Sequence, residues 1–219
     1  MNGHRSRAIQ KFFDHAESLL PVDLLELMLF VCISRKDTRE IAWKLYNRFG
    51  SLRAILSAPV DVLMSIEGIG KKTIFALKLF QKTCHFLLKE KIEKKKLLHA
   101  FDDLITYCQL TLGTIPYEQL RVIYLDIHNQ IIKDELIQNG ATNFIFIDPK
   151  YIIRQSIELG AMSIVLIHNH PSQCEKPSKE DISCTSKLFH VFKQLDITLQ
   201  DHLIVTGNTY FSFKQNGLI

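Results

Sequence analysis

With 219 residues, 47% hydrophobic content and a formal net charge of +4, the chain can bury one good core or two small ones. No apolar stretch is long enough to cross a bilayer, and residues 1–11 lead into no apolar signal segment, so we expect a cytoplasmic protein without a membrane partner. The five cysteines are odd in number and form no Cys-x-x-Cys pair, which argues against a disulfide framework.

Residues 1–90 are predicted to form a small all-α domain. Dense apolar spacing after Pro21 indicates a helix over 23–30, and Thr38 is expected to cap a helix over 39–49 that ends at Gly50. Shorter helical pieces are expected at 51–58 and 59–64, followed by a long helix over 73–89. We take residues 91–99, part of a lysine-rich segment, as a linker.

The periodicity changes near residue 100. Period-two alternation and β-branched runs predict strands over 120–127, 130–136, 143–147 and 163–167, with a helix over 149–160 between the last two. A helix over 179–195 and strands over 202–206 and 210–213 complete the pattern. The prediction is an α/β domain over 100–219, with a mixed sheet and flanking helices.

A pair of histidines directly after the predicted buried strand is the most informative motif. Side chains two apart on a strand share a face, so His168 and His170 can converge on one ion. Asp181 follows after ten intervening residues and can add a carboxylate. Two imidazoles and one carboxylate are the ligands of a catalytic zinc with an open fourth position, where a water becomes an effective nucleophile.

Asp181 also has a purely structural interpretation. Ser178 and Asp181 form a capping box at the start of the predicted helix, where the helix dipole favours a carboxylate. Cys174 lies in the loop after the two histidines and can approach a metal, but it is better explained as a thiol without a role in metal binding. The combination of buried strand, two histidines, a strand-ending proline and a capped helix favours the metal site.

Gly68-Ile69-Gly70, between two predicted helices, is the second motif. The glycines permit a tight turn whose amides can reach a phosphate oxygen, and Lys71 and Lys72 add positive charge. Residues 1–100 carry 18 Lys and Arg against 10 Asp and Glu, so a polyanion such as DNA is expected to bind this half. The alternatives are an ordinary helix-to-helix turn and a merely solvated lysine-rich segment.

Together these motifs resemble the RadC family, which pairs an N-terminal helix-hairpin-helix module with a C-terminal JAB/MPN metal-hydrolase domain of cytidine-deaminase-like fold. The resemblance runs nearly end to end. It rests on these segments: 47–52, 66–70, 168–172, 177–178 with Asp181, and 201–205.

The resemblance implies a role for each site residue. His168, His170 and Asp181 would bind Zn²⁺ as a JAMM motif, Glu135 would act as general base, and Ser178 would stabilise an oxyanion. Only the family pattern selects Glu135 over two other glutamates, Glu118 and Glu158. His202 is either a group that supports the ligands or an ordinary strand residue.

Two segments depart from the family pattern. Gln173 and Cys174 stand where the family usually has a glycine and an acidic residue, which bears on the loop conformation and on substrate access. The segment 32–37 replaces a glycine-rich loop that many relatives carry.

The sequence therefore predicts a zinc-dependent hydrolase of metallopeptidase type, acting on a peptide or isopeptide, with a DNA-binding helical module. Two alternatives stay open. One is a DNA-binding accessory protein of repair or recombination whose metal is not catalytic. The other is a metal-dependent nuclease, against which the acidic second half counts.

Overall fold

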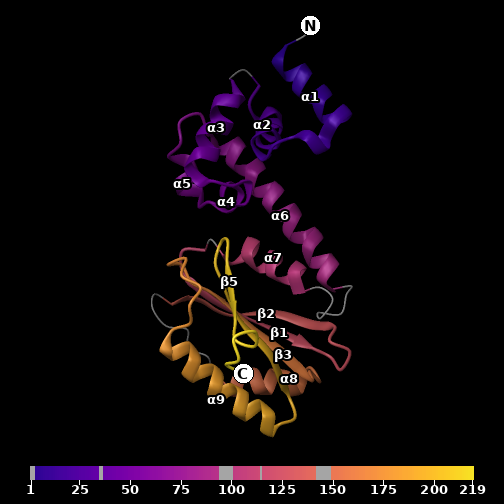
Figure 1. Ribbon diagram of the computed structural model, residues 1–219, viewed down its shortest axis with the longest axis vertical. Coiled ribbons are helices and arrows are strands. Elements are labelled where there is room, and N and C mark those ends of the chain that lie inside the picture. The colour runs from indigo at the N-terminus through magenta and orange to yellow at the C-terminus, as the bar shows by residue number, and fades with distance from the viewer. Residues whose placement is uncertain (1–2, 35–36, 94–100, 114, 142–148) are drawn as a thin grey trace. The chain divides into compact units, whose positions relative to one another are not determined.

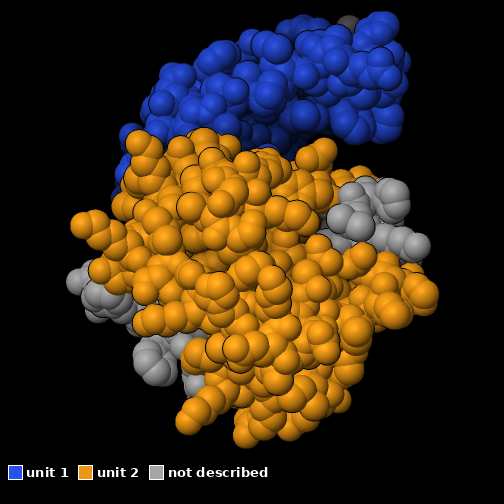
Figure 2. Space-filling view, turned by 60° about the horizontal axis from the view of Figure 1, so that its bottom comes forward, with its two compact units in different colours: residues 1–84 blue, residues 85–219 orange. Residues whose placement is uncertain are grey.

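The computed structural model describes residues 3–34, 37–93, 101–113, 115–141 and 149–219. The chain divides into two compact units, residues 1–84 and 85–219, which are coloured separately in Figure 2. The division falls inside the long helix α6 (Lys71–Glu93), whereas the sequence placed it at residue 90.

Helices alone make up the described part of the first unit (Figure 1). They are α1 (His4–His15), the 3-10 turn η1 (Ala16–Ser18), α2 (Pro21–Cys32), α3 (Thr38–Phe49), α4 (Leu52–Ser57), α5 (Val60–Met64) and the first part of α6. Their apolar faces meet in one core around the fully buried Leu25, Leu29 and Leu45. The helix α1 was not predicted, although Ile9, Phe12 and Phe13 recur at helical spacing, and it buries none of its residues.

The cap of α3 differs from the prediction by one residue. The helix begins at Thr38, and the capping carboxylate belongs to Asp37, which accepts a hydrogen bond from the Arg39 amide at 2.8 Å. The predicted end is confirmed, since Gly50 lies just beyond Phe49 in the left-handed conformation that terminates many helices.

A five-stranded mixed sheet forms the centre of the second unit. Its order is β2-β1-β3-β4-β5, and only the β3–β4 pair is parallel. The strands are β1 (Glu118–Leu125), β2 (Ile131–Ala141), β3 (Ser163–Asn169), β4 (Thr198–Val205) and β5 (Tyr210–Ser212). The predicted fold class, a mixed-sheet α/β domain preceded by an all-helical one, is confirmed.

Helices cover both faces of this sheet (Figure 1). On one face α7 (Phe101–Thr111) packs against alternate residues of β1, β3 and β4, among them Ile123, Val165 and Leu203. On the other face α8 (Pro149–Glu158) and α9 (Lys179–Gln194) pack against Leu120 and Leu166. The central strand β3 is therefore buried along its whole length.

The second unit differs from the prediction by one helix, because α7 was not predicted. The strand expected over 143–147 lies outside the described residues. None of the helices described is both long enough and apolar enough to cross a membrane.

Candidate metal centre

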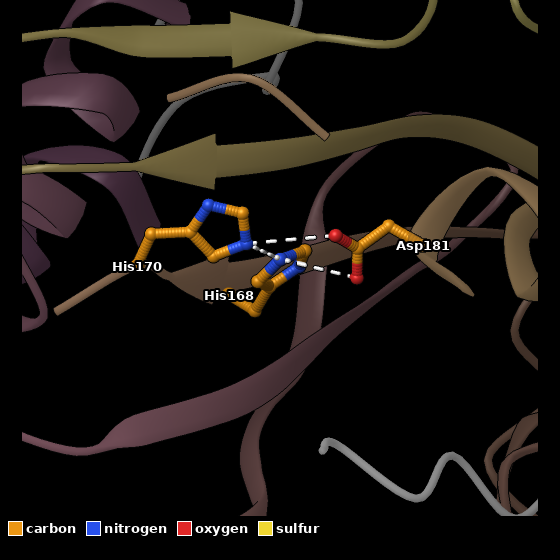
Figure 3. A group of neighbouring side chains, drawn as sticks. All are labelled: His168, His170 and Asp181. Atoms are coloured by element: carbon orange, nitrogen blue, oxygen red, sulfur yellow. Dashed lines mark hydrogen bonds and ion pairs between the residues drawn. The ribbon is translucent and has the colours of Figure 1, made fainter. Parts of the chain in front are cut away.

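Three side chains from two elements converge at the C-terminal end of β3 (Figure 3). His168 lies in β3, His170 follows it directly, and Asp181 lies in the first turn of α9. The two Nε2 atoms are 3.0 Å apart. Asp181 places Oδ1 3.5 Å from Nε2 of His168 and Oδ2 3.5 Å from Nε2 of His170. One ligand atom from each residue thus lies within 4.8 Å of the others.

These separations fit a zinc ion. Tetrahedral zinc holds nitrogen and oxygen ligands at about 2.0–2.2 Å, which places neighbouring ligand atoms about 3.3 Å apart. The two nitrogens are 3.0 Å apart, and each lies 3.5 Å from one oxygen of the Asp181 carboxylate, a different oxygen for each ring. Two imidazoles and one carboxylate are also the donor set of a zinc that keeps one position open for reaction.

A capping box aims the carboxylate at the histidines. The amide of Asp181 donates to Ser178 Oγ at 3.0 Å, and the amide of Ser178 donates to Asp181 Oδ2 at 2.8 Å. The hydroxyl of Ser178 donates to the same oxygen at 2.6 Å. The structural and the metal-ligand interpretations of Asp181 are therefore compatible, because the cap fixes the side chain that completes the site.

Burial and pairing give the three groups different proton affinities. Burial lowers the pKa of His168 to about 4. Burial also acts to lower the pKa of His170, but its bonds to Asp181 and to the Cys174 carbonyl outweigh this, and the pKa is raised. Burial acts to raise the pKa of Asp181, but its bonds to the histidines and to Ser178 hold that pKa below its usual range. An anionic carboxylate thus faces a neutral buried imidazole, an environment that favours a cation.

His202, on β4, lies directly behind the first ligand. Its Nε2 is 2.8 Å from His168 Nδ1, and its Nδ1 is 2.6 Å from the hydroxyl of Thr185 on α9. The ring is fully buried and stacks on Phe213, with centroids 4.6 Å apart. His202 is therefore in contact with a candidate ligand, as its interpretation as a supporting group requires.

Glu118, one of the two glutamates that were not selected as general base, begins β1, the strand next to β3. The β1–β3 register pairs Leu120 with His168, and continuing it places Glu118 opposite His170, with both side chains on the same face. Burial and the nearby Asp181 raise the pKa of Glu118, while His170 acts in the opposite direction. The carboxylate of Glu118 is therefore close enough to His170 and Asp181 to interact with both electrostatically.

Glu135, the general base chosen from the sequence, lies elsewhere. It stands on the edge strand β2 opposite Val122, which in turn pairs with Leu166, two residues before the ligand in β3. At about 4.8 Å per strand and 3.3 Å per residue, its backbone is about 12 Å from that ligand. Its Oε1 accepts hydrogen bonds from Lys133 Nζ at 2.7 Å and from the Tyr151 hydroxyl at 3.0 Å. The geometry thus disagrees with the choice of Glu135, because strand register places it two strands from β3.

Comparison with known proteins agrees with this architecture. A family model described as the RadC-like JAB domain matches residues 98–218. The chain belongs to the RadC family. A UPF0758 protein of Ruegeria pomeroyi is 33% identical over 217 residues, and a UPF0758 protein of Fusobacterium nucleatum is 37% identical over 225 residues. Each alignment covers 99% of this chain and 97% of the relative. The matched domain contains every residue of the metal centre.

The loop that departs from the RadC pattern is anchored by its unusual residue. Gln173 has a φ of 61°, the left-handed conformation that a glycine adopts easily. Its Nε2 donates to the Gly113 carbonyl at 3.0 Å, and its Oε1 accepts from the Gly207 amide at 3.0 Å. The next residue, Cys174, accepts a hydrogen bond from His170 Nδ1 through its carbonyl while its thiol stays free. Gln173 therefore keeps the backbone of a glycine and ties the metal loop to two other segments.

The glycine motif of the first unit forms the turn between α5 and α6. Gly68 has a φ of 90°, and an added Cβ would lie 3.1 Å from Ile41 Cδ1, so the turn itself requires glycine there. Gly70 has open space around it, and Lys71 and Lys72 are exposed at the start of α6. The turn alone explains Gly68, and phosphate binding by this segment stays a prediction.

Proposed function

We propose that this RadC-family chain is a zinc-dependent hydrolase that cleaves amide bonds in the manner of a metallopeptidase. The observation that carries the proposal is the convergence of His168, His170 and Asp181, whose ligand atoms lie within 4.8 Å of one another, with Glu118 close enough for His170 and Asp181 to act on its pKa. A zinc ion held by these ligands supplies a Lewis acid that polarises a carbonyl and acidifies water.

Glu118 is the group best placed to move a proton in this reaction. Its raised pKa makes it a stronger base than an ordinary glutamate, so it can accept a proton from the attacking water and return it to the leaving amine. Ser178 holds Asp181 in place through its hydroxyl. On turning towards the substrate, the same hydroxyl can donate to the negative charge that develops on the carbonyl oxygen.

Three variants test the proposal: His168→Ala, Glu118→Gln and the matched control Glu135→Gln. Zinc content is measured by mass spectrometry, and hydrolysis is measured on a pool of fluorogenic peptides of mixed sequence. We expect His168→Ala to lose zinc, and Glu118→Gln to keep zinc while turnover falls by about 10²–10⁴-fold. Glu135→Gln should keep both. Zinc-free wild type, or a loss of turnover confined to Glu135→Gln, would contradict the assignment.

DNA binding by the first unit is a second candidate function. The observation in its favour is the exposed pair Lys71 and Lys72 beside the open Gly70. Replacing both lysines by alanine should weaken binding to duplex DNA and reduce the slope of log Kd against log salt by about 2. Replacing the exposed Lys44 and Lys82 is the matched control. Wild type without affinity for DNA at low salt would refute this function.

A further inference from the structure

The hydrogen bonds behind the metal centre determine which nitrogen of His168 carries a proton. Thr185 Oγ1 lies 2.6 Å from the backbone carbonyl oxygen of Asp181 and 2.6 Å from Nδ1 of His202. A carbonyl can only accept, and a hydroxyl has one proton to give. When Thr185 donates to that carbonyl, its oxygen accepts a hydrogen bond from Nδ1–H of His202.

The direction of this hydrogen bond determines where the proton lies on the rings of both His202 and His168. With its proton on Nδ1, His202 presents an accepting Nε2, 2.8 Å from His168 Nδ1, which must then be the donor. His168 is left with a lone pair on Nε2. His170 is fixed in the same way, because its Nδ1 lies 2.7 Å from the Cys174 carbonyl, which can only accept. When His170 is neutral, its Nε2 also carries a lone pair, and the two Nε2 lone pairs meet 3.0 Å apart beside the carboxylate.

The reverse direction is incompatible with a metal. If Thr185 donated to His202, then Nε2–H of His202 would donate to His168, and the proton of His168 would sit on the nitrogen that faces the metal centre. In that arrangement the Asp181 carbonyl also loses its bond from Thr185. Thr185 and His202 are both buried, so unmade hydrogen bonds on either side chain would be costly.

We propose that Thr185 and His202 form a tautomer relay, a pair of positioning residues that keep Nε2 of His168 unprotonated for the metal. The relay begins at the backbone carbonyl of Asp181 and ends at the ring of His168. Formation of the first turn of α9 therefore determines which nitrogen of His168 carries the proton. It rests on the proposed function for the identity of the ion. Partners of this kind contribute about 10–100-fold to metal affinity.

The substitution Thr185→Val tests the relay, because it removes the accepting hydroxyl and keeps the side-chain shape. Thr185→Ser restores the hydroxyl. The control is Ser156→Ala, which removes another buried helical hydroxyl whose partner is the Ile152 carbonyl at 2.9 Å. Two quantities are measured: the ring protonation of the metal-free protein by ¹H–¹⁵N NMR at neutral pH, and the Kd for zinc by chelator competition.

We expect metal-free wild type to carry its ring protons on Nδ1 of both His168 and His202. Thr185→Val should bind zinc about 10–100-fold more weakly, while Thr185→Ser and Ser156→Ala bind as wild type does. A proton on Nε2 of His202 in wild type, or an unchanged Kd in Thr185→Val, overturns the relay. If Thr185→Val does not fold, the wild-type NMR spectrum still decides. Wild type that binds no zinc but shows the expected tautomers would refute the proposed function and leave the relay intact.

Discussion

Gln173 allows a test of the metal loop that needs no substrate. Two substitutions separate the stabilisation by its side-chain hydrogen bonds from the free-energy cost of its left-handed backbone. Gln173→Ala removes both side-chain hydrogen bonds and keeps a residue with a Cβ in the left-handed region. Gln173→Gly removes the same bonds but adopts that region without strain.

The size of each effect follows from the contacts. Each of the two bonds contributes about 0.5–1 kcal/mol, the lower part of the usual range because Gln173 is exposed. The left-handed conformation costs a residue with a Cβ about 1 kcal/mol relative to glycine. Gln173→Ala should therefore destabilise by about 1–2 kcal/mol, and Gln173→Gly by about 1 kcal/mol less than that. For a chain of this length, 1 kcal/mol corresponds to about 2–4 °C in Tm.

Urea and thermal unfolding of the metal-free protein measure the relative stabilities of wild type and the two Gln173 variants. Asp196 supplies a matched control in the same unit, since it has a φ of 55° and is exposed. Asp196→Gly should exceed Asp196→Ala in stability by the same 1 kcal/mol or so that separates the two Gln173 variants. If Gln173→Ala is as stable as Gln173→Gly while the Asp196 pair differs, Gln173 does not hold the left-handed conformation in solution. If Gln173→Ala is as stable as wild type, the two side-chain hydrogen bonds do not anchor the loop.

Three further predictions concern the second unit. Gly113→Ala should destabilise by about 1–3 kcal/mol or more in urea unfolding, because its Cβ would collide with the backbone just after β4, and an unchanged midpoint would refute this. Arg121→Met should cost about 3–5 kcal/mol, since it removes the guanidinium from the buried Asp134 carboxylate and leaves the neutral Tyr107 hydroxyl as its donor. The double variant with Asp134→Leu should recover most of the loss. Acidifying the metal-free protein should destabilise it, because the pKa of His168 is lowered to about 4 and the unfolded chain therefore binds that proton at a higher pH than the folded chain does. The free energy of unfolding should fall between pH 6.5 and 4 by up to about 3 kcal/mol. The raised pKa of His170 partly offsets this loss. Equal unfolding free energies at pH 7 and 4.5 would contradict the predicted loss of stability in acid.

Periodicity predicted the elements that bury one face of a regular pattern. The strand β3 and the helix α9 were found within a few residues of their ends, because each presents a continuous apolar run or stripe to the core. The helix α7 was missed although Leu104, Cys108 and Leu112 recur every fourth position and are buried. That signal was present in the sequence. The same holds for α1, where Ile9, Phe12 and Phe13 recur at helical spacing although none of them is buried.

The ligands of the metal centre could be predicted because they are local. His168, His170 and Asp181 lie on one strand, its end and the next helix, so their spacing already determines that they can meet. The residues that complete the centre come from strands that only tertiary pairing brings alongside. His202 reaches His168 because parallel pairing sets it beside Leu166, and no local pattern specifies that register.

The choice between the two glutamates shows where spacing stops being informative. Glu135 fell inside a predicted strand, whereas the strand expected over 120–127 began two residues after Glu118, so the alternation of side chains was never extended to it. Both carboxylates face the same side of the sheet, and what separates them is the strand order, in which β1 lies between β2 and β3. A base must reach the atom that it deprotonates, so one strand of displacement, about 4.8 Å, favours Glu118 over Glu135 as the base of the proposed reaction.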